Sequence, residues 1–112
     1  MIDASKFIAA AALYSGSDPW NMVTGKEKVS RAMPLASVLT LPATGSEMNA
    51  NAVISRAEIE EKWGLGSRHF YPRFSILDPT TTLSLPPRYI ANGVVDAYVH
   101  VIEQYLTYDV NT

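Results

Sequence analysis

The chain has no cysteine, no hydrophobic run long enough to cross a membrane, and no excess of basic residues. Without cysteine, disulfides and thiolate metal sites are excluded, and a reducing, cytoplasmic location is expected. The longest aliphatic-rich run, Phe7 to Tyr14, is too short for a bilayer, so no membrane partner is expected. Nine basic and eleven acidic residues are mixed along the sequence, which argues against a nucleic-acid partner.

The sequence alternates between helical and strand-like segments and predicts an α/β fold. Its 112 residues are 47% hydrophobic and 18% charged, which suits one small domain. A buried strand is expected at 34–41, where an apolar run is bounded by proline, and further short strands at 52–55 and 73–77. A first helix capped by Asp3 is expected to run to Tyr14, and residues 57–66 read as a charged surface excursion.

A second helix is expected from Pro87 to Thr107, where two prolines suit the first turn. Within it, Asp96 and His100 stand four residues apart, so a carboxylate and an imidazole share one face and could meet one ion. Two ligands are fewer than a catalytic metal needs. The spacing alone leaves open an ordinary acid–histidine contact on a solvated face. Gly93 is costly inside a helix and could mark a close approach by another segment.

Other polar residues admit both a structural and a functional reading. The run Thr44-Gly45-Ser46-Glu47 fits a helix capping box, and its hydroxyls and N–H groups could instead meet a ligand. His69 is a lone histidine, more often structural than a metal ligand. Lys62 lies in the charged segment and reads by itself as solvated.

Several of these segments together resemble the iron-containing (group III) alcohol dehydrogenase family, and most of all its branch of NADPH-dependent aldehyde reductases and butanol dehydrogenases. The resemblance covers essentially the whole chain, and its last motif is the most specific. The motifs that carry it are Leu39-Thr40-Leu41-Pro42-Ala43-Thr44-Gly45-Ser46-Glu47, Ala52-Val53-Ile54-Ser55-Arg56, Leu77-Asp78-Pro79, Leu85-Pro86-Pro87-Arg88 and Ala91 to Tyr105.

The resemblance implies a fold, a reaction and partners. Residues 1–85 would be part of a dinucleotide-binding α/β domain, and residues 86–112 the first helix of an all-α metal-binding domain. The implied reaction is hydride transfer between NADP (or NAD) and a small aldehyde or alcohol, with a divalent metal, Fe²⁺ or Zn²⁺, as Lewis acid. Full-length members of the family are expected to be homodimers.

The resemblance also assigns residues, all of them expectations. Asp96 and His100 match the first two metal ligands, and two further histidine ligands of the family lie well downstream. Asp3 and Lys6 match an aspartate and a lysine that follow the family's glycine-rich pyrophosphate loop. The expected cofactor positions are Thr40, Thr44, Asn49, Asn51, Val53, Lys62 and Thr81. At Thr81 many members carry leucine, and Leu41-Pro42-Ala43 replaces a commoner threonine, small residue and glycine.

Two other hypotheses remain beside this one. Because the glycine loop and the downstream histidines are not in the sequence, the chain reads as an internal fragment that is inactive alone. It could then be a non-catalytic folding unit that self-associates. Glycerol dehydrogenases and dehydroquinate synthases share a similar plan, but the form Asn92-Gly93-Val94-Val95-Asp96-Ala97 favours the alcohol dehydrogenases.

Overall fold

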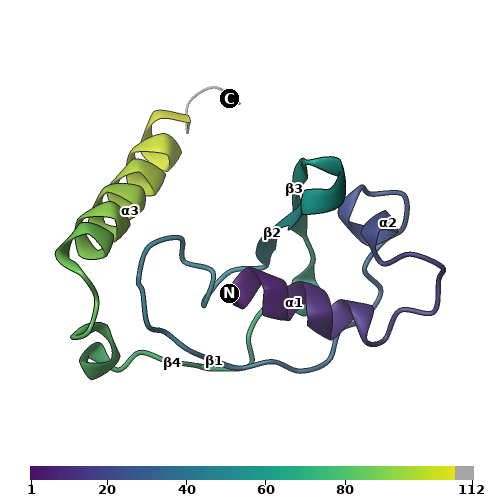
Figure 1. Ribbon diagram of the computed structural model, residues 1–112, viewed down its shortest axis with the longest axis horizontal. Coiled ribbons are helices and arrows are strands. Elements are labelled where there is room, and N and C mark those ends of the chain that lie inside the picture. Colours follow the sequence, from purple (N-terminus) through teal and green to yellow (C-terminus); the bar gives the residue numbers. More distant parts are fainter. Residues whose placement is uncertain (108–112) are drawn as a thin grey trace. The chain divides into compact units, whose positions relative to one another are not determined.

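The structure of the chain, a computed structural model, describes residues 1–107 and mixes helices with short strands, as the α/β prediction required (Figure 1). The helices are α1 (Ile2–Ala11), α2 (Trp20–Val23) and α3 (Pro87–Thr107). The strands are β1 (Ser37–Val38), β2 (Asn51–Arg56), β3 (Glu61–Gly66) and β4 (Ser75–Ile76). Short 3-10 turns lie at η1 (Ala57–Ile59), η2 (Arg68–Phe70) and η3 (Pro79–Thr82). No helix within 1–107 is both long and apolar enough to cross a membrane.

The chain divides into two compact units. The first unit comprises Met1–Ser37 and Ser46–Ser75, and the second comprises Val38–Gly45 and Ile76–Thr112. This division follows the contacts within the present chain. The predicted boundary between residues 85 and 86 concerns the two domains of the family's enzymes, and it stays a prediction.

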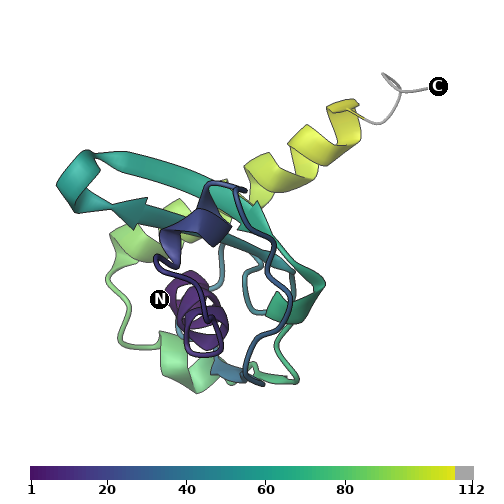
Figure 2. The same ribbon diagram turned by 90° about the vertical axis from the view of Figure 1, so that its right-hand side faces the viewer.

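The first unit is built on an antiparallel hairpin of β2 and β3, against which α1 packs (Figures 1 and 2). The strands pair from Asn51 opposite Gly66 to Arg56 opposite Glu61, and Glu60 in the connection has a left-handed φ of 52°. A small core unites α1, α2, β2 and η2. Its buried members are Ala10, Met22, Ala52 and Phe70.

The hairpin corrects the expectation for residues 57–66. Only residues 57–60 are a connection, and Glu61–Gly66 is a strand. Gly64, Gly66 and the charged residues before them are uncommon in strands, which is why composition pointed to a loop. Pairing with the strand-forming sequence of β2 overrides that weak local preference.

The start of α1 also differs from the prediction. The cap position is Met1, and Asp3 lies inside the first turn, so Asp3 does not cap the helix. Its carboxylate accepts hydrogen bonds from the N–H of Val53, at 2.8 Å, and from the hydroxyl of Ser46. These two long-range partners replace the local N–H groups that a capping aspartate would accept from.

The capping-box reading of Thr44–Glu47 is wrong as well, because a turn and no helix follows it. Gly45 has a φ of +68°, a conformation that favours glycine. The apolar segments at 34–41 and 73–77 do pair, but the strands shrink to β1 and β4. In the second unit, the N–H of Leu39 donates to the carbonyl of Ile76 at 2.9 Å.

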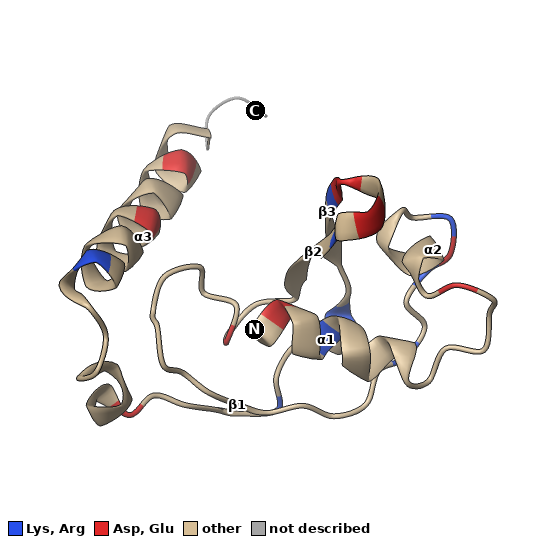
Figure 3. Cartoon of the chain, viewed as in Figure 1, with Lys and Arg blue, Asp and Glu red and all other residues tan. Residues whose placement is uncertain are grey.

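The second unit is dominated by α3, whose bounds agree with the prediction of a helix from Pro87 to Thr107. The helix carries few charges, at Arg88, Asp96 and Glu103 (Figure 3). Most of its apolar side chains are exposed, with Tyr98 at 66% and Tyr105 at 79%. The apolar side chains of α3 therefore have little to pack against within residues 1–107.

Candidate functional site

The covered face of α3 is the one that carries Gly93 and Asp96, which stand three residues apart. Gly93 is the buried residue of the helix, and Asp96 is half-buried. A Cβ placed on Gly93 would come within 2.6 Å of the carbonyl oxygen of Pro42 and 3.7 Å of the Cβ of Ala43. The absence of a side chain at Gly93 therefore lets the helix backbone approach the backbone of Pro42. This close approach explains why a glycine stands inside the helix.

Asp96 and His100 converge on this helix as predicted. The Oδ2 atom of Asp96 lies 3.6 Å from Nε2 of His100, and Glu103 Oε2 lies 3.9 Å from Nδ1 of the same ring. Both separations are too long for hydrogen bonds. Asp96 Oδ2 is inaccessible to solvent and has no hydrogen-bond partner.

An orphaned carboxylate oxygen facing an imidazole nitrogen fits a shared cation. Two ligands on one tetrahedral ion at about 2.1 Å lie roughly 3.4 Å apart, close to the observed separation. A carboxylate and an imidazole suit Fe²⁺, Zn²⁺ and similar divalent ions. Within 1–107, no group of three or more His, Cys, Asp or Glu side chains could hold an ion. The pair therefore fits two ligands of a site and not a complete one.

Three expected cofactor positions, Thr40, Thr44 and Thr81, fall in the same unit as this pair. Thr40 and Thr44 are exposed and flank the Leu41–Ala43 segment that Gly93 contacts. Thr81 is half-buried, and its hydroxyl donates to the carbonyls of Leu39 and Asp78 at 2.7 and 2.8 Å. Thr81 therefore holds the segment that leads into Thr40. Its hydroxyl has one proton, and the backbone carbonyls accept it.

The other expected cofactor positions, Asn49, Asn51, Val53 and Lys62, belong to the first unit. Asn49 Oδ1 accepts from the N–H of Asn51 at 3.0 Å and from the Lys6 ammonium at 2.9 Å. Val53 is about half exposed. Lys62 is exposed on β3 opposite Ser55, in a strand and not in the expected loop. The cofactor roles of these residues remain predictions.

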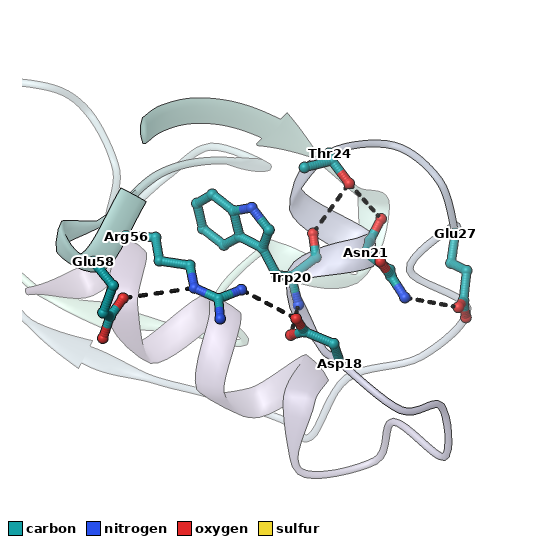
Figure 4. Close-up of polar contacts among 7 residues, drawn as sticks. All are labelled: Asp18, Trp20, Asn21, Thr24, Glu27, Arg56 and Glu58. Carbon is teal, nitrogen blue, oxygen red and sulfur yellow. Dashed lines mark hydrogen bonds and ion pairs between the residues drawn. The ribbon is translucent and has the colours of Figure 1, made fainter. Parts of the chain in front are cut away.

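Two further polar features lie in the first unit. His69 lies in η2, and its backbone N–H donates to the hydroxyl of Ser67. A second cluster joins Arg56 to Asp18 at 3.0 Å and to Glu58 at 3.5 Å, with the guanidinium 5.8 Å from the Trp20 ring centre (Figure 4). The backbone N–H of Trp20 and the Arg56 guanidinium lower the pKa of Asp18. This cluster ties α2 to the end of β2 and is structural.

Sequence reasoning missed what Asp3 and Lys6 do. Lys6 is wholly buried, and its ammonium donates to Asn49 and Asn51. The one local signal was a charged pair three residues apart in a helix that is otherwise apolar on nearly all faces.

Comparison with known proteins agrees with the motifs. The profile of the family "iron-containing alcohol dehydrogenase" matches residues 1–79. The chain is 54% identical over 109 residues to the NADPH-dependent aldehyde reductase YqhD of Escherichia coli, covering 96% of the chain and 28% of that protein. It is 48% identical over 112 residues to the probable NADH-dependent butanol dehydrogenase 1 of Bacillus subtilis, covering 100% of the chain and 29% of that protein.

Among solved structures, the fold matches the NADH-dependent butanol dehydrogenase A of Thermotoga maritima with a TM-score of 0.87 and 44% identity, covering 91% of the chain and 25% of that structure. The chain thus spans less than a third of the length of the curated relatives it matches. The family profile, these relatives and the shared fold together show that the chain belongs to the iron-containing alcohol dehydrogenase family.

Proposed function

We propose that this chain supplies part of the cofactor and metal cleft of an NAD(P)H-dependent alcohol dehydrogenase or aldehyde reductase. The observation that carries the proposal is the orphaned Oδ2 of Asp96, held 3.6 Å from Nε2 of His100 on the covered face of α3. Family membership supports a nicotinamide cofactor and a metal, since the named relatives are NADPH- or NADH-dependent dehydrogenases and reductases.

Each proposed residue has a physical role in this account. When bound, the nicotinamide supplies the hydride, and a divalent metal (Fe²⁺ or Zn²⁺) polarises the carbonyl that receives it. Asp96 and His100 would contribute one oxygen and one nitrogen ligand, with Glu103 beside the other ring nitrogen to orient the imidazole. The hydroxyls of Thr40 and Thr44 would line the cofactor side of the cleft, next to the segment on which α3 rests.

In the first unit, Asn49, Asn51 and Val53 would lie near the nicotinamide and its ribose, and Lys62 would reach a ribose hydroxyl. The proposal extends to a small aldehyde or alcohol as substrate, to a homodimeric full-length enzyme and to the cytoplasm. The relatives' names support the substrate class, and the absence of cysteine supports a reducing compartment. Both NADPH- and NADH-dependent relatives match, so NADP and NAD both fit.

A hybrid enzyme tests the proposal, with this chain replacing the matching segment of the E. coli aldehyde reductase. We expect the hybrid to oxidise NADPH in the presence of a short aliphatic aldehyde. Asp96→Ala and His100→Ala should each lower kcat about 100-fold or more, because each removes a ligand. His69→Ala is the matched histidine control and should retain activity. A hybrid that keeps full activity with both ligand residues replaced refutes the proposal.

The exposed apolar side chains of α3 favour a second candidate, in which the chain alone is an inactive unit that self-associates. Val94, Tyr98, Val101 and Tyr105 are each at least 65% exposed, and contiguous apolar surface of this kind promotes association. Sedimentation over a hundredfold range of concentration tests this. A constant monomer mass excludes self-association. Turnover by the isolated chain comparable with the full-length relative would contradict the inactivity expected of it.

A further inference from the structure

Asp3 and Lys6 lie on one face of α1, turned toward the segment that carries three proposed cofactor positions. We infer that these two are positioning residues that hold Ser46–Val53 in place for the nicotinamide cofactor, and that they are not themselves ligands of the cofactor. The inference rests on the proposed function for its cofactor and on the hydrogen bonds of the first unit for its geometry.

Lys6 has no hydrogen-bonding capacity left for a ligand. Its ammonium donates to the carbonyl of Asn49 at 2.9 Å, to Oδ1 of Asn49 at 2.9 Å and to the carbonyl of Asn51 at 2.8 Å. An ammonium group has three donors, and all three are used. The side chain is also wholly buried, which lowers its pKa, an effect partly offset by Asp3 and Glu47. A lysine that bound a pyrophosphate would keep a donor free and accessible.

Asp3 completes the attachment from the preceding turn of α1. Its Oδ2 accepts from the N–H of Val53 at 2.8 Å, and its Oδ1 accepts from the Ser46 hydroxyl. In an antiparallel strand, alternate residues direct their N–H and C=O groups to the same edge. Val53 N–H and Asn51 C=O therefore point to the edge of β2 that β3 leaves unpaired. The two α1 side chains bond to this edge in place of a neighbouring strand.

The attachment fixes the segment at both ends. Ser46 lies at its start, Asn49 just before β2, and Asn51 and Val53 within β2, and each of them bonds to α1. The turn 46–50 has no regular structure and loses its conformational freedom through hydrogen bonds to other segments. Besides those to α1, these are the Ser75 hydroxyl on the Glu47 carbonyl and the Ser67 N–H on the Ala50 carbonyl. Loosening the bonds to α1 should weaken cofactor binding while leaving the chemical step intact.

Hydrogen exchange of the 112-residue chain tests the geometry. The Val53 amide should exchange at least tenfold more slowly than an unbonded amide, although its residue is exposed. Asp3→Ala should remove this protection, and Asp3→Asn should keep it, because the amide oxygen still accepts. The Ile54 amide, directed toward β3, is the internal control for folding. Rapid exchange at Val53 in the unsubstituted chain overturns the inference whether or not any variant folds.

The hybrid enzyme tests positioning. Asp3→Ala should raise the KM for NADPH about tenfold with kcat within about threefold, as expected when uniform binding is lost. Asp3→Asn should restore the KM to within about threefold of the original. An unchanged KM in Asp3→Ala, or no rescue by Asp3→Asn, overturns the inference. A hybrid without turnover refutes the proposed function instead, and hydrogen exchange alone then decides whether Asp3 holds the segment.

Discussion

In the first unit, Phe70, Ala10 and Ala52 are at most 1% exposed, whereas across 38–45 and 76–107 of the second unit only Gly93 is buried. The first unit places even a lysine inside, with every donor satisfied. The second unit exposes tyrosines and valines along α3 and covers the glycine and the aspartate. Apolar burial, the main source of stability, is therefore concentrated in the first unit, while the second unit holds the candidate metal ligands.

The contrast implies that each unit responds to substitution in its own way. Regions with few buried apolar contacts open at low free-energy cost, and regions with a packed core open only in global unfolding. Changes inside the first unit should lower the free energy of unfolding of the chain. Changes on α3 should leave that quantity nearly unaltered and instead affect the local contact at Gly93 and the proposed metal ligands.

The largest effect is expected from Phe70→Ala. Removing a wholly buried ring should lower the free energy of unfolding by about 3–5 kcal/mol, measured by urea denaturation. Phe74→Ala, with a ring 61% exposed in the same unit, is the matched control and should cost less than about 1 kcal/mol. Tyr105→Ala on α3 should also be nearly neutral. An equal loss of free energy of unfolding in Tyr105→Ala and Phe70→Ala would contradict the claim that stability is concentrated in the first unit.

A smaller loss is expected from Lys6→Met. The new side chain fills similar volume but removes the donor to the carbonyls of Asn49 and Asn51, while Asn49 Oδ1 keeps the N–H of Asn51; the change should cost about 2 kcal/mol. Lys62→Met, at an exposed position on β3, is the control and should have little effect. Equal urea-denaturation midpoints for the two variants would show that the hydrogen bonds of Lys6 do not contribute to the stability of the chain.

Gly93→Ala sharpens the comparison within the second unit. In a solvated helix this change stabilises by about 1 kcal/mol, but here the new Cβ would lie 2.6 Å from the Pro42 carbonyl oxygen. We expect the contact between α3 and residues 41–43 to be weakened by about 1 kcal/mol, with altered NMR shifts at those residues and a nearly unaltered free energy of unfolding of the chain. Gly64→Ala, where nothing lies within 4 Å, should leave those shifts unchanged. A stabilised Gly93→Ala with unaltered shifts at 41–43 would mean that α3 does not rest on this segment.

The smallest expected effect is on the stability of the chain at low pH. The backbone N–H of Trp20 and the Arg56 guanidinium hold the pKa of Asp18 below its ordinary value in the first unit, and the Thr80 hydroxyl and N–H do so for Asp78 in the second. A lowered folded pKa contributes stability above the ordinary value, about 4, that is lost as pH falls toward the folded one. Asp18→Asn should reduce the fall in the free energy of unfolding as the pH drops below about 4. Asp78→Asn should leave that pH dependence nearly unchanged and affect only the contacts around η3. An unchanged pH dependence in Asp18→Asn would contradict this assignment.

Local patterns in the sequence predicted the elements whose causes are local. The helix Pro87–Thr107 was identified to its ends because two prolines and a helical period mark it. The approach of Asp96 to His100 follows from the same period. The strand β3 was missed because its glycines and charged residues are uncommon in strands, and only pairing with β2 makes it one. The roles of Asp3 and Lys6 were missed because their partners lie 50 and 43 residues further along the chain. The cofactor positions came from family resemblance, and no local spacing would have found them.

The central claim is that Asp96 and His100 hold a divalent metal, and metal content measures it most directly. The hybrid enzyme, purified after growth with Fe²⁺ and Zn²⁺ and then dialysed, should retain about one metal ion per chain by mass spectrometry. Asp96→Ala and His100→Ala should lose most of this metal, and His69→Ala should keep it. Full metal occupancy in the His100→Ala enzyme would contradict the account and place the metal elsewhere.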